Sequence, residues 1–103
     1  NAHTGQVKIG KIKQILNGST TYLNWDINTA KYSKRYYDGA TEDSLTVQLK
    51  SDRNGGLILE YSMPPNNGTT GKDRNVDVHI SMPYDNKLYY TPNVVISFYQ
   101  TER

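Results

Sequence analysis

The chain has no cysteine, only one Phe, one Trp and two His among 103 residues, and no long apolar run. The absence of cysteine excludes a disulfide scaffold and a thiolate metal site. A transmembrane helix is not expected either, because no stretch approaches about 20 consecutive apolar residues. The formal net charge is only +2. This argues against duplex nucleic acid as a partner, since such partners require a concentrated basic stripe.

Tyrosine and regular alternation are what the chain does contain. Tyr contributes nine aromatic residues, beside the one Trp and the one Phe. Its apolar ring and polar tip suit half-buried strand faces and binding surfaces. Apolar residues recur at every second position in short runs, as in strands with one face toward a core. The most regular run is 94–99, where Val94, Ile96 and Phe98 share one face.

Turn signals separate these runs about every eight to twelve residues, which is typical of a sandwich or barrel. No strand–helix–strand alternation appears, so a parallel sheet is not expected. We therefore predict a single domain over 1–103, an all-β antiparallel Ig-like sandwich of about seven to eight strands. The predicted strand runs are 6–16, 21–27, 32–37, 45–50, 57–61, 76–82, 88–90 and 94–99.

The first run can be read in two ways. Val7 and Ile9 alternate as in a strand, but Ile12 falls out of phase, and Gly10 at the break suggests a bulge that resets the alternation. The apolar spacing also fits a short helix, although the internal glycine and the short length disfavour one. Further along, the polar stretch 64–75 predicts a mobile loop.

The core is expected to draw on the inward positions of these runs, with Trp25 as its anchor. The predicted core residues are Leu23, Trp25, Leu45, Val47, Leu49, Leu59, Val76, Val78, Ile80, Val94, Ile96 and Phe98.

No catalytic or metal-binding constellation stands out. His79 and Ser81 share a strand face, but no nucleophile elbow marks Ser81. The turns at Asp26 and Asp52 contain oxygen ligands suited to Ca²⁺, but each lacks the closing bidentate Glu of an EF-hand loop, so a turn-capping role is favoured. We therefore expect a protein that is not an enzyme and that needs no cofactor.

Tyrosines and basic residues gather between 31 and 37. Aromatic rings beside cations stack sugars, hold acidic glycans or stack the bases of a single strand. The plainer alternative is an edge strand with half-buried tyrosines. A carbohydrate-binding module and a small OB-like single-stranded nucleic-acid-binding protein stay open as functions, although the strand number and the low charge argue against the second. The predicted ligand-binding residues are Tyr32, Lys34, Arg35, Tyr36 and Tyr37.

The last strand, 93–100, resembles the closing strand of fimbrial subunits assembled by the chaperone–usher route. Those subunits are Ig-like sandwiches that end in an alternating apolar strand with a near-terminal aromatic residue. The runs 44–50, 55–62 and 76–82 are similar in texture. Many such subunits carry a disulfide, so only the cysteine-free branches fit this chain. The glycine expected upstream of the terminal aromatic residue is also missing from 84–92.

The resemblance implies an extracellular, structural or adhesive subunit of a bacterial surface fibre. Its partners would be other copies or related subunits, a periplasmic chaperone, and a host-surface glycan or protein. It also implies an incomplete sandwich that receives a strand from a neighbour, because an inserted strand supplies both ladder hydrogen bonds and core side chains. The N-terminal run is then either a donor strand or the first strand of the sandwich. The residues implicated in strand pairing are Val7, Ile9, Val94, Ile96 and Phe98.

Overall fold

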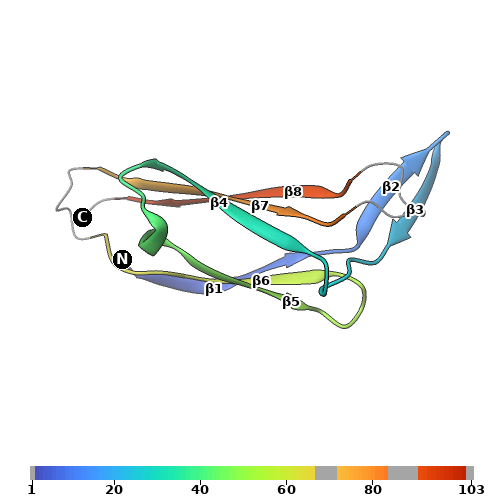
Figure 1. The fold of residues 1–103 in the computed structure, drawn as a ribbon, viewed down its shortest axis with the longest axis horizontal. Coiled ribbons are helices and arrows are strands. Elements are labelled where there is room, and N and C mark those ends of the chain that lie inside the picture. The colour runs from blue at the N-terminus through green and yellow to red at the C-terminus, as the bar shows by residue number, and fades with distance from the viewer. Residues whose placement is uncertain (1, 67–71, 84–90, 102–103) are drawn as a thin grey trace.

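The computed structural model describes residues 2–66, 72–83 and 91–101. Within these ranges the predicted all-β antiparallel fold is confirmed (Figure 1). The predicted strand at 88–90 and the middle of the predicted loop at 64–75 lie outside the described residues. The described elements are β1 (His3–Ile9), β2 (Ile12–Leu16), β3 (Ser19–Leu23), β4 (Lys31–Asp38), the 3₁₀ turn η1 (Glu42–Ser44), β5 (Thr46–Ser51), β6 (Leu57–Met63), β7 (Arg74–Ser81) and β8 (Asn93–Gln100).

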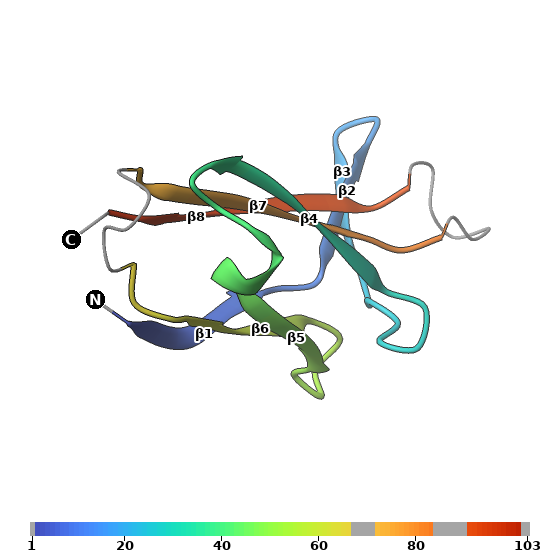
Figure 2. The ribbon, with the colours of Figure 1, turned by 60° about the vertical axis from the view of Figure 1, so that its left-hand side comes forward.

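Two three-stranded sheets face each other, and a two-stranded hairpin extends from one end (Figures 1 and 2). The first sheet has the order β1-β6-β5 and the second has the order β4-β7-β8. The hairpin consists of β2 and β3. All pairs are antiparallel. This order corresponds to strands B-E-D and C-F-G of an immunoglobulin sandwich, with the hairpin inserted between B and C.

Gly10 separates two strands that belong to different sheets. β1 ends at Ile9 in the first sheet, and the hairpin begins at Ile12. The prediction that 6–16 is extended is therefore correct, and the helical alternative is wrong. The expected bulge within one continuous strand is also wrong, because the segment forms two separate strands. The indole nitrogen of Trp25 donates a hydrogen bond of 3.1 Å to the Gly10 carbonyl, which fixes the backbone between the two strands.

Asn17 and Gly18 form the turn between β2 and β3. Asn17 and Gly18 both have positive φ, 50° and 80° respectively, as a type I′ turn requires. The predicted run 21–27 ends early, because β3 stops at Leu23. Trp25 lies outside the strand but remains a core residue, with its backbone N–H donating 2.8 Å to the carbonyl of Gly55.

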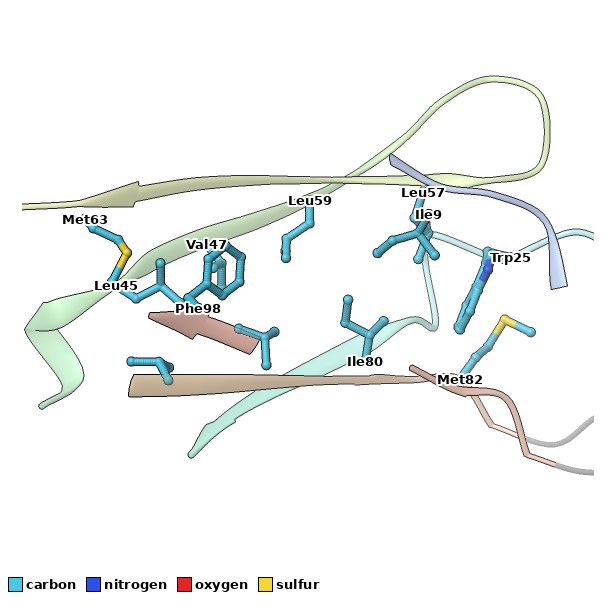
Figure 3. Close-up of a cluster of buried hydrophobic side chains, with 12 residues drawn as sticks. Ile9, Trp25, Leu45, Val47, Leu57, Leu59, Met63, Ile80, Met82 and Phe98 are labelled. Carbon is cyan, nitrogen blue, oxygen red and sulfur yellow. The ribbon is translucent and has the colours of Figure 1, made fainter. Parts of the chain in front are cut away.

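The core lies between the two three-stranded sheets (Figure 3). Every predicted core residue belongs to it, although Leu23, Leu49, Val94 and Ile96 are only half-buried. Burying a Leu, Val or Ile side chain fully contributes about 1.5–3 kcal/mol, so these buried side chains supply most of the driving force for folding. The buried apolar residues are Ile9, Trp25, Leu45, Val47, Leu57, Leu59, Met63, Val76, Val78, Ile80, Met82 and Phe98.

Candidate functional site

Strand β4 divides the predicted ligand-binding residues between two faces. Its positions 32, 34 and 36 pair with three fully buried residues of β7, so they lie on the inner face of the second sheet. Arg35 and Tyr37 occupy the alternate positions and lie on the outer face. The five residues therefore do not form one surface. The inward pairs are Tyr32 with Ile80, Lys34 with Val78 and Tyr36 with Val76.

The inward residues of β4 connect the second sheet to the first through hydrogen bonds to the backbone of β5 and of the segment before it. The Lys34 ammonium donates to the carbonyl of Leu45 at 2.7 Å and to the carbonyl of Glu42 at 3.1 Å. It also lies 5.7 Å from the centre of the Tyr36 ring. The Tyr32 hydroxyl donates over 3.4 Å to a backbone carbonyl of β5. These contacts close one long side of the sandwich, where β4 faces β5 (Figure 2).

The outer face of the second sheet carries a hollow of about 520 Å³, lined mostly by polar and charged residues. The register places Ser33 beside His79, and Lys31 beside Ser81. The alternation of the sequence already put His79 and Ser81 on one strand face, but only the strand order puts them next to β4. The lining residues are Lys31, Tyr32, Ser33, Arg35, His79, Ser81, Thr91 and Asn93.

The predicted strand-pairing residues gather on the opposite long side of the sandwich, where β1 faces β8. Val7, Val94 and Ile96 are half-buried there, and Ile9 and Phe98 are buried. β1 and β8 are the edge strands of their sheets, each with one partner among the described strands. We call this side the β1/β8 seam. The N-terminal run is thus the first strand of the sandwich in this structure.

Aromatic side chains cover one end of the β1/β8 seam. The Tyr61 ring lies 4.8 Å from the Phe98 ring and 5.4 Å from the His3 ring, measured between centroids. The Tyr61 hydroxyl and the His3 Nε2 atom are 2.8 Å apart. Gly5 lies beneath this ring, and a Cβ there would lie 2.8 Å from the Tyr61 oxygen, so a larger residue would displace the end of the Tyr61 side chain.

The other end of the β1/β8 seam is hollow. A pocket of about 370 Å³ lies between the backbone of 9–15 and the start of β8. Its apolar lining includes Ile12, Trp25, Pro92 and Val94. The seam thus has half-buried apolar side chains along its length and open space at this end.

Two exposed titratable groups on the outer faces have shifted pKa values. A hydrogen bond from Lys50, at 2.9 Å, and a second from Gln6, also at 2.9 Å, lower the pKa of the Glu60 carboxyl. The Tyr99 hydroxyl donates to the Asp73 carboxylate, which raises the pKa of Tyr99. Both groups stabilise pairings on the surface and lie outside the hollows described above.

The turn carboxylates cap backbone N–H groups. Asp26 Oδ1 accepts from the N–H of Asn28 at 2.9 Å. Asp52 Oδ1 accepts from Asn54 at 2.7 Å and from Gly56 at 2.9 Å. These are Asx turns, in keeping with the turn-capping interpretation of the sequence. Among the residues that the structure covers, no three His, Asp or Glu side chains are placed to hold a metal ion.

Comparison with protein-family models, with curated proteins and with solved structures finds no match for this chain. No helix in the described part of the chain has the length and apolarity needed to cross a bilayer.

Proposed function

We propose that this protein is an extracellular structural or adhesive subunit of a bacterial surface fibre, in which a neighbouring subunit contributes a strand to the β1/β8 seam. The observation that carries the proposal is a pair of edges, on β1 and on β8, that have no second partner among the described strands and that flank a stripe of half-buried apolar residues. A periplasmic chaperone would cover the same stripe before assembly.

The two long sides of the sandwich differ in a way that supports this proposal. Where β4 faces β5, the Lys34 and Tyr32 side chains bond to backbone carbonyls and close the gap. Along the β1/β8 seam, the half-buried side chains that pack against the core are the apolar Val7, Val94 and Ile96. A strand inserted there adds ladder hydrogen bonds to an edge and covers these side chains with its own alternate residues.

A second copy of the chain contains a suitable donor. Its β1 has apolar residues two positions apart, at Val7 and Ile9, and among the strands that the structure describes it pairs with β6 alone. An edge strand of this kind exchanges between copies more readily than a central strand, because only one ladder must open. Related subunits with a similar N-terminal strand would serve equally well.

The mass of the full chain in solution tests the proposal. Light scattering across a wide concentration range should show multiples of the 11.7 kDa subunit. These multiples should persist after dilution and in mild denaturant, since release of an exchanged strand requires partial unfolding. A single 11.7 kDa species at every concentration, including after refolding at high concentration, would overturn the proposal.

Two neighbouring positions on β8 provide a matched pair of variants. Ile96→Thr places a hydroxyl in the β1/β8 seam and should reduce the assembled fraction strongly. Val95→Thr makes a similar change on the outer face, where Val95 is 50% exposed, and should leave assembly unchanged. Circular dichroism must show that both variants fold. Equal assembly of the two folded variants would contradict a role for the inner face of β8.

A further inference from the structure

From the outer hollow of the second sheet we infer a binding site for a saccharide that bears a carboxylate or sulfate group. Three neighbouring strands build the hollow, and their alternate residues all point to the same side. Residues opposite one another share a face, so Ser33, His79 and Val95 form one row across the sheet. Lys31, Ser81 and Asn93 form the next row.

The charge lining the hollow is positive. Lys31 and Arg35 line it, and none of the lining residues that the structure describes is acidic. Within the described part of the chain, the side chains of Lys31 and Arg35 make no hydrogen bond or ion pair. The nearest carboxylate in register is Asp77, opposite Arg35, and its Oδ1 atom accepts a hydrogen bond of 2.7 Å from Ser97. An arriving anion would therefore find donors that are not already committed.

The other lining groups favour a sugar over a bare ion. Ser33, Ser81, Thr91 and Asn93 add hydroxyl and amide groups, which match the hydroxyls of a saccharide. The volume of about 520 Å³ exceeds what an inorganic anion fills and lies within the usual range of small-molecule sites.

This site does not depend on strand exchange. The hollow lies on the outer face of the second sheet, whereas the proposed assembly uses the inner face and the edges at the β1/β8 seam. The saccharide would thus be accessible on the free subunit and on an assembled fibre alike.

The experiment titrates the ¹⁵N-labelled full chain with glucuronic acid, glucose 6-sulfate and unmodified glucose, followed by amide chemical shifts at low salt. The two anionic sugars should shift amides of 31–35, 79–81 and 93, and glucose should bind at least about tenfold more weakly, because it lacks the charge-assisted hydrogen bonds. Comparable binding of glucose, or shifts centred elsewhere, would overturn the inference.

Two variants that each remove one positive charge test whether Arg35 itself contributes to binding of the anionic sugars. Arg35→Gln should weaken binding about tenfold, because it removes a charged donor from the hollow. Lys13→Gln lowers the net charge equally, on the exposed face of the β2–β3 hairpin, and should change affinity less than about twofold. Equal effects would indicate unspecific attraction and refute a built site.

Two further measurements separate this inference from its rivals. Arg35→Gln should assemble as the unmodified chain does, so loss of sugar binding with normal assembly supports the site independently of the proposed fibre. A short single-stranded oligonucleotide should bind more weakly than the anionic sugars. Tighter oligonucleotide binding with a steep dependence on salt would overturn the saccharide assignment in favour of a nucleic-acid surface.

Discussion

Replacing Lys34 by Met should destabilise the protein without affecting ligand binding. The sequence suggested this lysine as a ligand-binding residue, but its ammonium group donates to the carbonyls of Leu45 and Glu42. Methionine keeps most of the apolar stem of lysine and removes the charged donor. The carbonyl of Leu45 then loses its partner in a half-buried environment.

The expected loss follows from the geometry of these contacts. A hydrogen bond that involves a charged group contributes about 1.5–3 kcal/mol. The bond to Leu45, at 2.7 Å and half-buried, accounts for most of the effect, whereas the exposed bond to Glu42 adds little. The cation–π contact with Tyr36 contributes about 0.5 kcal/mol, the lower end of the range for exposed contacts. From these three contacts together, we expect the Lys34→Met substitution to lower the free energy of unfolding by about 2 kcal/mol.

Thermal and urea unfolding measure this change. A loss of about 2 kcal/mol lowers the melting temperature of a domain of this size by roughly 10 °C. Arg35→Gln is the matched control, because the adjacent residue carries the same charge but points outward. It should alter stability by less than about 0.5 kcal/mol. A Lys34→Met protein as stable as the unmodified chain would refute the assigned role in closing the sandwich.

Three other outcomes are expected. Trp25→Phe should cost about 2 kcal/mol in urea unfolding, because it shrinks a buried ring and removes the indole donor from a backbone carbonyl. The pKa of Glu60 is lowered in the folded protein, so its ion pair with Lys50 contributes to stability above the ordinary pKa of 4.5. This contribution is lost as the pH falls through the pKa of Glu60 in the folded state. The urea midpoint of the Lys50→Met variant should therefore fall less on acidification than that of the unmodified chain. The raised pKa of Tyr99 means that its contribution is complete below pH 10.0 and is lost as pH rises through the folded value. Ultraviolet titration should show one late-titrating phenol, which Asp73→Asn returns to the ordinary range.

The strands and most of the core could be predicted because period-two alternation depends only on neighbouring residues. The residues omitted from the predicted core include Leu57, Met63 and Met82, which lie at strand ends or beyond them. The position of Ile12 in the separate β2–β3 hairpin could not be predicted from the apolar alternation alone. A residue that falls out of phase is equally consistent with a bulge within one strand.

The candidate sites were less predictable than the strands. The cluster at 31–37 was found as a group of aromatic and basic residues, but alternation along β4 sends Lys34 and Arg35 to opposite faces. The partners of Arg35 in the outer hollow, His79 and Asn93, come from strands far away in the chain. Nothing local in the sequence reveals such neighbours, because sheet order depends on long-range pairing.

By itself the sequence determined that the chain forms antiparallel strands and which side chains of each strand face inward, since both follow from local alternation and turn chemistry. Only the tertiary structure decided which strands lie side by side. That choice leaves β1 and β8 as edges along one apolar seam and collects the basic residues of the second sheet around one hollow. The physical reason is that burial of the two inner faces fixes the order of the strands, and the order in turn fixes what meets on the outside.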